Sequence, residues 1–343
     1  MPTGYVYDPI FLEHDLRGHP ESRDRLFGVM RLLREQGLTE QMEPVLAPPV
    51  ERQYLELNHT ATYIDHVAEM SARGGGYLDL DTYIAPKTFE AALRAAGGVH
   101  AAVEAVLRGK LDNAVCLVRP PGHHAIRNRG MGFCIFNNIA VAAHAARAQG
   151  LAKRVFIVDF DVHHGNGTQT SFYKDPDVLF CSTHQYPYYP GTGSIHEVGE
   201  GLGRGYTINM PLPPGVGDAG FQALMDEVIE AAGKRFKPDI MLVSAGYDAH
   251  WADPLASLSL SLAGYAAISR RLVQMAKKLC GGRIVFTLEG GYHPNVLPQG
   301  VCNTCRAVLG LPPEGDLDLL GPSPHSEPSL DALIRAVRQM HGL

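Results

Sequence analysis

Short apolar runs alternate with longer stretches of helical spacing along most of this chain. Apolar runs rich in β-branched residues predict buried strands, and here they cover residues 113–118, 155–163, 177–183, 206–212, 239–245 and 283–288. Between the runs, the spacing of apolar residues predicts helices at residues 89–107, 218–235 and 262–280. Strands that alternate with helices in this way favour an α/β fold, with a parallel sheet and helices on both faces.

Neither an internal repeat nor a linker interrupts this pattern, so we predict a single domain over residues 1–343. The segment after Leu311 is rich in proline at first and then predicts a terminal helix near residues 330–340. We expect residues 312–343 to form a peripheral extension of the domain.

Two polar stretches near the N-terminus have weaker patterns. A proline followed by Glu21 and Asp24 predicts a loop that enters a helix, with both acidic residues in its first turn. Spacing alone makes Arg25 a charge on the surface of this helix. Residues 77–86 carry Asp81 and predict a surface loop.

The stretch at residues 155–169 combines an apolar run with carboxylates and imidazoles. Side chains alternate faces along a strand, so Asp159, Asp161 and His163 are expected to share one face. Two carboxylates and an imidazole are costly to bury without a counter-charge, and a divalent metal would supply one. The alternative is a pair of hydrogen-bonded aspartates beside a structural histidine.

Polar side chains also follow three other predicted strands. They are His123 and His124 after the run at 113–118, Asp248 after the run at 239–245, and Tyr292 after the last run. Ligands of open parallel sheets bind beyond the carboxyl ends of the strands, so we expect these residues to converge. One polar residue at a strand end is usually a cap or a turn former, but here four strand ends carry such residues.

Asp161, His163 and Asp248 would form a metal site of mixed oxygen and nitrogen ligands with an open position. This ligand set suits catalytic zinc, with ferrous iron as the alternative. A metal in such a site lowers the pKa of a bound water and polarises a substrate carbonyl.

The other polar residues suggest acid–base chemistry around that metal. A neutral histidine of the pair His123–His124 could take a proton from water, with Asp159 placed to hold His123 and Asn166 placed to hold His124. Tyr292 could donate to a developing oxyanion, and loss of one such donor typically costs on the order of 10²-fold in rate. The two glycines before Tyr292 would let it approach closely.

Composition narrows the class of protein. The chain is 45% hydrophobic and 19% charged, with a formal net charge of -6, which is ordinary for a globular protein. No basic block suggests nucleic-acid binding, and no apolar run suggests a membrane span or a signal peptide. The six cysteines do not suggest a disulfide framework. We therefore expect a cytoplasmic protein.

Six motifs resemble those of the zinc-dependent histone deacetylase superfamily, which includes bacterial deacetylase-like amidohydrolases and acetylpolyamine amidohydrolases. They occur in family order over residues 15–310. The long forms RPPGHHA and LEGGY are more similar to the class II branch. The motifs are RPPGHH at 119–124, GFCIFNN at 132–138, DFDVHHGNGT at 159–168, PGTG at 190–193, SAGYD at 244–248 and LEGGY at 288–292.

The resemblance implies an arginase/deacetylase fold with a central parallel sheet of about eight strands and helices on both faces. It also implies one zinc ion, and hydrolysis of an N-acetyl amide to an amine and acetate. It implies zinc ligation by Asp161, His163 and Asp248, and catalytic roles for His123, His124, Tyr292, Asp159 and Asn166. It implies substrate contacts by Phe133, Gly132, Tyr189, Leu255, Asp81 and Arg25. It also implies a structural potassium ion at Asp159 and Ser182, held partly through the backbone.

Three positions refine these expectations. Tyr189 stands where members usually carry phenylalanine, which leaves the substrate open between acetyl-lysine in a peptide, an acetylated polyamine and another small acylated amine. Asn166 stands where class I members carry aspartate. Arg25 matches an interior arginine near the acetate exit, which is the opposite of the surface position that spacing alone predicts.

Two other functions remain as alternatives. A catalytically silent protein could keep the pocket for an acylated ligand, and a ureohydrolase of the same fold could hold two metals. A serine or cysteine nucleophile is not supported, because no GxSxG motif is present and Cys134 has no dedicated base. We expect no nucleic-acid or membrane partner, and the pattern leaves open whether the chain forms a homo-oligomer.

Overall fold

The computed structural model describes residues 2–313 and 320–343, and the described residues form an eight-stranded sheet. All of its pairings are parallel, and the strand order is β2-β1-β5-β10-β9-β6-β7-β8. The strands are β1 Thr3–Val6, β2 Glu43–Val45, β5 Asn113–Cys116, β6 Val155–Asp159, β7 Val178–Gln185, β8 Thr207–Leu212, β9 Ile240–Ala245 and β10 Ile284–Leu288. The predicted α/β fold is confirmed.

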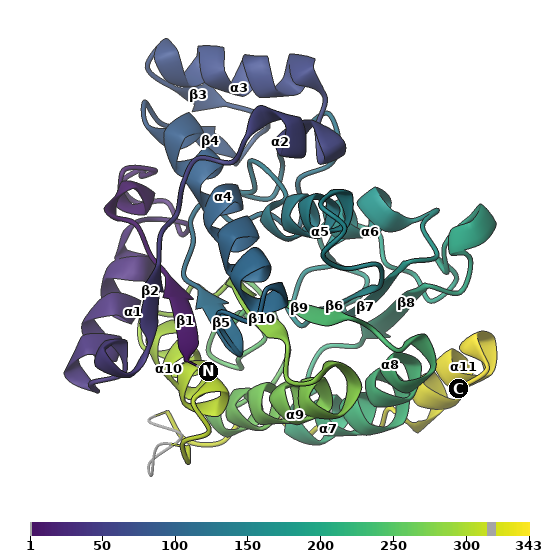
Figure 1. Ribbon diagram of the computed structural model, residues 1–343. Helices are drawn as coiled ribbons and strands as arrows, with labels where there is room; N and C mark the ends of the chain where they lie inside the picture. The colour runs from purple at the N-terminus through teal and green to yellow at the C-terminus, as the bar shows by residue number, and fades with distance from the viewer. Residues whose placement is uncertain (1, 314–319) are drawn as a thin grey trace.

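Helices cover both faces of the sheet (Figure 1). The upper face in this view carries α2 Arg52–Asn58, α3 Ala61–Ala72, α4 Thr88–Leu107, α5 Asn138–Ala148 and α6 Asn166–Phe172. The lower face carries α7 Asp218–Leu224, α8 Glu230–Phe236, α9 Leu262–Cys280, α10 Val296–Val308 and α11 Asp331–His341, and α1 Asp24–Glu35 packs against α10. Because both faces are covered, the central strands β6, β9 and β10 consist mostly of apolar residues.

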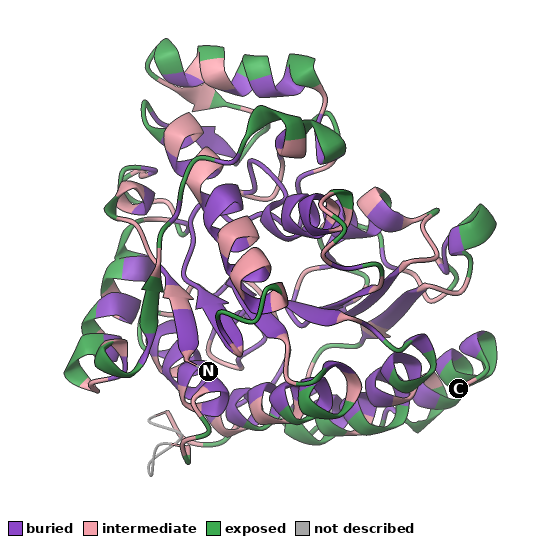
Figure 2. Ribbon diagram, viewed as in Figure 1, coloured by how far each residue is buried: buried purple, intermediate pink, exposed green. Residues whose placement is uncertain are grey.

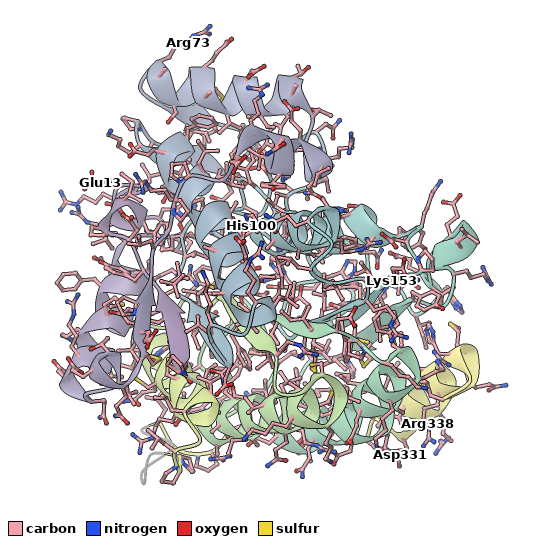
Figure 3. All side chains as sticks on the ribbon, viewed as in Figure 1. Glu13, Arg73, His100, Lys153, Asp331 and Arg338 are labelled. Carbon is pink, nitrogen blue, oxygen red and sulfur yellow. The ribbon has the colours of Figure 1, made fainter. Side chains whose placement is uncertain are left out.

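The core lies on the two faces of the sheet, and Figure 2 shows the central strands buried from end to end. Every residue of β6, β9 and β10 is buried. Full burial of one large aliphatic or aromatic side chain contributes about 1.5–3 kcal/mol, so these strands form a rigid base for the segments that follow them. Charged side chains such as those of Arg73, Lys153 and Arg338 are exposed and point outward (Figure 3).

Several predicted elements differ from those observed. The helix predicted at residues 218–235 is divided into α7 and α8 by a π-helical turn at Met225–Ile229. The loop predicted at 77–86 is wrong in part, because the short strands β3 Gly76–Tyr77 and β4 Tyr83–Ile84 pair antiparallel and leave a loop of residues 78–82 between them.

The acidic first turn predicted near Glu21 is also wrong in part. Helix α1 begins at Asp24, which does lie in its first turn, whereas Glu21 precedes the helix and is buried. The strands β1 and β2 and the helices α2, α6 and α10 were not predicted.

The order of the strands determines where functional side chains meet. β5, β10, β9 and β6 are consecutive neighbours at the centre of the sheet. They are the four strands that His123–His124, Tyr292, Asp248 and Asp161–His163 follow in the sequence. Their parallel direction brings these segments to one edge.

The C-terminal region packs on the domain. Ile334 and Val337 of α11 are buried, and α11 contacts β8 and the π-helical turn. Residues 314–319 of the predicted extension 312–343 lie outside the described residues. Among the described helices, none has the length and apolar character needed to cross a membrane.

Candidate active site

Three potential metal ligands meet where β6 and β9 end. Asp161 and His163 follow β6, and Asp248 follows β9, which pairs with β6. One ligand atom of each residue lies within 4.8 Å of the other two. His163 Nδ1 lies 3.2 Å from Asp161 Oδ1 and 3.3 Å from Asp248 Oδ2. β6 ends at Asp159, so the loop rather than strand alternation orients Asp161 and His163, and the alternation argument was wrong for them.

The surroundings of these three residues, here called the metal-type cluster, fit a cation. Asp248 Oδ2 is buried and makes no hydrogen bond among the described residues, although His163 Nδ1 lies nearby. A buried carboxylate without a full complement of partners is costly. A Cβ at Gly246 would collide with the Asp161 carboxylate, and a Cβ at Gly290 would collide with the carboxylates of Asp248 and Asp161. Two carboxylates and one imidazole form a donor set that suits zinc.

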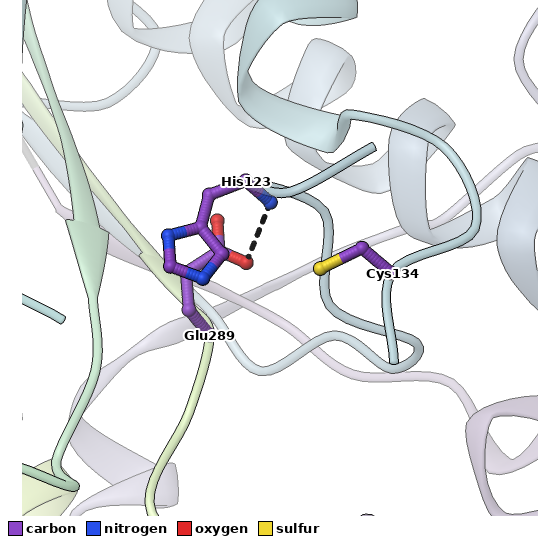
Figure 4. A group of neighbouring side chains, drawn as sticks. All are labelled: His123, Cys134 and Glu289. Carbon is purple, nitrogen blue, oxygen red and sulfur yellow. Dashed lines mark hydrogen bonds between the residues drawn. The ribbon is translucent and has the colours of Figure 1, made fainter. Parts of the chain in front are cut away.

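A second group of potential ligands, His123, Cys134 and Glu289, lies close by (Figure 4). Its atoms already have partners, because Glu289 Oε2 accepts from the backbone N–H groups of Gly122 and His123, and Glu289 Oε1 accepts from the Ser244 hydroxyl. Burial raises the pKa of the Cys134 thiol well above its usual value, which disfavours the thiolate that a metal needs. This group therefore holds the histidine loop against β10 and does not suit a metal.

Each of the paired histidines is held through Nδ1. His123 Nδ1 lies 3.0 Å from Asp159 Oδ2, and His124 Nδ1 lies 2.8 Å from Asn166 Oδ1. A carboxylate or an amide oxygen accepts hydrogen bonds, so both Nδ1 atoms donate and leave Nε2 for other partners. His123 Nε2 lies 3.9 Å from Asp161 Oδ1. The structure therefore brings together the pairs that the sequence analysis proposed.

The surroundings of the two rings favour different charges. Burial lowers the pKa of His124 well below its usual value, and the neighbouring His123 and His163 lower it further. Burial also lowers the pKa of His123, but Asp161 and Asp159 outweigh that effect and raise it to about 10. The pair thus combines an imidazole held by an amide with one held by a carboxylate, which is an arrangement capable of proton transfer.

Tyr292 lies beside the metal-type cluster at the end of β10. Its ring meets that of Phe133 edge-on at 5.8 Å, and Arg25 Cζ lies 4.9 Å from its centroid. Burial raises the pKa of its hydroxyl well above 10, so the hydroxyl remains a donor. Arg25 donates to the carbonyls of Gly291 and Glu289 at 2.8 Å and 2.6 Å. Arg25 is therefore interior, and the surface position predicted from spacing was wrong.

A cavity of about 410 Å³ connects the metal-type cluster and the histidine pair with an exposed mouth. Among its lining residues are five of the six predicted substrate contacts, namely Gly132, Phe133, Tyr189, Leu255 and Asp81. The sixth, Arg25, lies behind Tyr292 and lines a separate cavity of about 100 Å³. The Tyr189 ring is half exposed and meets the His124 ring edge-on at 5.1 Å.

The wall at Gly132 and Phe133 has an unusual backbone. Their φ angles are 55° and 68°, and Phe133 is one of two described residues other than glycine with positive φ. A left-handed conformation costs a non-glycine residue about 1–2 kcal/mol. A Cβ at Gly132 would lie 2.5 Å from His124 Cδ2, and the Phe133 N–H donates to Thr82 Oγ1 at 3.1 Å. Close packing on the histidine pair therefore requires this backbone.

The loop of residues 78–82 forms one side of the mouth. Asp81 is exposed, and its Oδ1 lies 3.3 Å from His19 Nε2. The His19 ring meets that of Phe133 edge-on at 4.8 Å. The position of Asp81 at the rim is thus connected to the cavity wall through His19.

A second ionic cluster, here called the arginine–glutamate cluster, lies beside the histidine loop. Arg119 donates to Glu21 Oε1 at 2.6 Å and to Oε2 at 2.5 Å, and Arg25 donates to Oε1 at 2.9 Å. Arg119 also donates to the carbonyl of Phe11 at 2.8 Å. Arg119 and Glu21 are fully buried. Burial raises the pKa of Glu21, but the two guanidinium groups outweigh it and hold that pKa well below its usual value.

The predicted potassium ligands Asp159 and Ser182 are cross-strand neighbours on β6 and β7. His184 Nε2 lies 2.8 Å from the Gly193 carbonyl and must donate to it, so Nδ1 accepts from the Ser182 hydroxyl at 2.9 Å. Burial lowers the pKa of His184 to about 4, which keeps it neutral. The lone pairs of the Ser182 oxygen therefore remain available to a cation.

Several residues of the site were not predicted from the sequence. Thr82 and Asp253 lie in loops, and only the three-dimensional fold brings them beside Phe133 and Tyr292. Glu289 did carry a signal, because it directly follows the apolar run of β10, as Asp159 follows the apolar residues of β6. Burial and the neighbouring Asp248 raise the pKa of Asp253 to about 7.

Comparisons with known proteins agree with this geometry. A family model described as the histone deacetylase domain matches residues 19–308. A "Probable deacetylase" of Archaeoglobus fulgidus is 47% identical over 316 residues, which cover 91% of this chain and 87% of that protein. The "Histone deacetylase-like amidohydrolase" of Pseudomonas aeruginosa is 40% identical over 282 residues, which cover 82% of this chain and 74% of that protein.

A solved structure shows the same fold. The crystal structure of the HDA15 HD domain superposes with a TM-score of 0.89 at 35% identity, and the match covers 99% of this chain and 94% of that one. The match extends over elements that the sequence pattern did not predict, among them β1, β2 and α10.

Proposed function

We propose that this chain, which belongs to the histone deacetylase family, is a zinc-dependent deacetylase that converts an N-acetylated amine to free amine and acetate. Its relatives are named deacetylases and amidohydrolases, and the chain is accordingly a hydrolase of amide bonds. The observation that carries the choice of mechanism is Asp248 Oδ2, which is buried beside Asp161 and His163 and makes no hydrogen bond to any residue that the structure describes. Zinc in this cluster would polarise the substrate carbonyl and acidify a water molecule.

The residues around the metal-type cluster supply the remaining chemistry. His124 is held through Nδ1 and stays neutral, so its Nε2 can accept a proton from the attacking water. His123 beside Asp159 has a raised pKa and stays protonated, so its Nε2–H can give a proton to the leaving amine. The Tyr292 hydroxyl donates to the carbonyl oxygen as negative charge develops on it. Phe133 and Tyr189 flank the chain that carries the acetyl group and exclude water from it.

We propose acetyl-lysine in a peptide or an acetylated polyamine as the substrate. A deep cavity with aromatic walls fits an extended alkyl chain, and a mouth that carries Asp79 and Asp81 favours a cationic group outside the cavity. Tyr189 stands where phenylalanine is usual, and its hydroxyl supports a substrate whose alkyl chain carries a polar group near this wall.

Acetate release by the purified protein tests the proposal. A panel of acetyl-lysine peptides, acetylpolyamines and short-chain acyl amides is supplied to protein loaded with zinc or with ferrous iron. We expect one acetate per amine, and we expect Tyr292→Phe to lower kcat by about 10²-fold with unchanged metal content. Binding of these ligands without turnover would show a silent binding protein, and two manganese ions per chain with release of urea would show a ureohydrolase.

We also propose a structural potassium ion at Asp159 and Ser182. It is supported by the free lone pairs of the Ser182 oxygen and by the carboxylate opposite. Replacement of potassium by sodium or lithium should shift the melting temperature of the wild-type protein, and Ser182→Ala should reduce that shift.

A further inference from the structure

One buried carboxylate joins the catalytic side of the cavity to its mouth. Asp253 lies in the segment between β9 and α9, and only 5% of its surface is exposed. Its side chain accepts three backbone hydrogen bonds. Oδ2 accepts from the N–H groups of Tyr292 at 2.8 Å and His293 at 3.1 Å, and Oδ1 accepts from the N–H of Leu255 at 3.0 Å.

The contacts continue from Leu255 around the cavity. The Tyr188 hydroxyl donates to the Leu255 carbonyl at 2.8 Å. The Tyr188 ring stacks on that of His163, with centroids 5.8 Å apart and planes inclined by 23°. Asp253 thus links the backbone of Tyr292 to that of Leu255 at the mouth. Leu255 is linked in turn to His163 of the metal-type cluster through Tyr188.

We infer that Asp253 is the positioning residue that holds the backbone of Tyr292 in register with the mouth of the cavity. The inference rests on the proposed catalytic role of Tyr292. The Asp253 carboxylate is too deeply buried to act as a solvated surface charge, and both of its oxygens are used for backbone N–H groups.

The segment that carries Tyr292 needs such a support. Gly291 has a φ of 118°, a region open to glycine, so the peptide before Tyr292 can adopt many conformations. Arg25 holds this segment from one side through the carbonyls of Glu289 and Gly291. Asp253 holds it from the other side through the next two N–H groups. With both in place, the ring of Tyr292 has a defined position.

The variant Asp253→Asn removes this support with little change of volume. An asparagine keeps one carbonyl oxygen, but its NH₂ group must face the N–H of either Leu255 or Tyr292. Because a displacement of about 1 Å at a reacting group can cost about 10²-fold in rate, we expect kcat for acetate release to fall by about 10- to 100-fold. Zinc content should be unchanged, since Asp253 touches none of the three proposed ligands by a hydrogen bond.

A double-mutant cycle with Tyr292→Phe separates positioning from general loosening of the fold. If Asp253 acts through the Tyr292 hydroxyl, Asp253→Asn should have almost no further effect on kcat in the Tyr292→Phe background. Additive losses would overturn the inference, as would wild-type kcat in Asp253→Asn.

Glu327→Gln is the control for the loss of a carboxylate that anchors backbone. Glu327 is exposed, unlike Asp253, but it also accepts from three backbone N–H groups, those of Gly217, Ala219 and Gly220 at the start of α7, and it lines no part of the cavity. We expect it to leave kcat unchanged. A fall in kcat equal to that of Asp253→Asn would show that any lost backbone anchor has this effect and would overturn the inference.

If Asp253→Asn does not fold, Asp253→Glu replaces it in the cycle. This variant keeps both acceptor oxygens on a longer side chain, and we expect a smaller fall in kcat with the same lack of additivity. Turnover by the wild-type protein distinguishes failure of the proposed deacetylase function from failure of the role inferred for Asp253. Absence of turnover would overturn both. Normal turnover with additive losses would overturn the inference alone.

Discussion

The metal-type cluster and the arginine–glutamate cluster are both buried and charged, but only one of them is complete. Both oxygens of Glu21 receive guanidinium N–H groups from Arg119, and Arg25 adds a third contact. Asp161 and Asp248 contact the His163 ring and backbone N–H groups, with His123 Nε2 at 3.9 Å from Asp161, and one Asp248 oxygen makes no hydrogen bond among the described residues.

This difference separates two uses of buried charge. A complete cluster stabilises one arrangement of the loops, because removal of any partner leaves an uncompensated charge. An incomplete cluster is stable only when an ion or a proton completes it. The first is therefore expected to determine stability, and the second is expected to determine activity and the response to metal.

The largest effect is expected at the incomplete cluster. Asp248→Asn removes one proposed zinc ligand while the hydrogen bond from the Val162 N–H can be kept. Loss of a metal that supplies several kcal/mol of transition-state stabilisation corresponds to a fall of roughly 10³-fold or more in kcat/KM. Acetate release and bound zinc measure this effect. The unfolding free energy of the metal-free protein should not fall, and full activity of the variant would contradict the assignment.

The complete cluster should behave in the opposite way. Glu21→Gln leaves two buried guanidinium groups without their carboxylate, and breaking a buried pair typically costs about 3–5 kcal/mol. Unfolding in guanidinium chloride measures this loss. Glu69→Gln is the control, because Glu69 and Arg73 form an exposed pair at 3.1 Å, and such pairs contribute at most about 1 kcal/mol. Equal losses in both variants would remove the contrast between the clusters.

The effect of zinc on the melting temperature should also distinguish the metal-type cluster from the arginine–glutamate cluster. A ligand that binds only the folded protein stabilises it by about 2.7 kcal/mol at a hundred times its Kd. Addition of zinc to chelator-treated protein should therefore raise the melting temperature. The rise should be absent in Asp248→Asn and retained in Glu21→Gln, and a rise in both would place the bound zinc elsewhere.

Acid should lower the stability contributed by the arginine–glutamate cluster by a smaller amount than these substitutions do. The folded pKa of Glu21 lies well below its usual value of 4.5, so its contribution to stability is fully present above that value. The contribution is lost as the pH falls from the unfolded pKa toward the folded one. The wild-type protein should lose more stability than Glu21→Gln between pH 5 and about pH 3, and parallel pH profiles would contradict the role of Glu21.

Much of the fold could be predicted from the sequence because its central strands are continuous apolar runs. Strands buried on both faces differ sharply in composition from the loops around them, as the run at 239–245 and β9 show. β1 and β2 are only four and three residues long, and two of the three residues of the edge strand β2 are exposed, so their local pattern is weak. Pro298 lies in the first turn of α10 and obscures the helical pattern there.

Some residues of the candidate site could likewise be predicted from the sequence, and others could not. Asp161, His163, Asp248 and the histidine pair directly follow predicted strands, so a parallel sheet is enough to bring them to one edge. The salt bridge between Glu21 and Arg119 spans 98 positions of the chain, and no local spacing marks either residue as a partner of the other.

Loop geometry explains the remaining differences. Asp253 reaches the backbone of Tyr292 only because of the path taken by the segment between β9 and α9. Thr82 reaches Phe133 only because β3 and β4 pair and present the loop between them. The direction of a loop depends on contacts along its whole length, so neither residue could be assigned from its immediate sequence.

Gly246 and Gly290 lead to one more consequence. Neither carries a functional group, yet a Cβ at either position would occupy space taken by the Asp161 or Asp248 carboxylate. In a deep mutational scan scored by deacetylation, both glycines should tolerate substitution as poorly as the proposed ligands. Intolerance at these sites reports the volume required by a neighbouring carboxylate, so a map of intolerant positions would outline the metal-type cluster and its packing shell together.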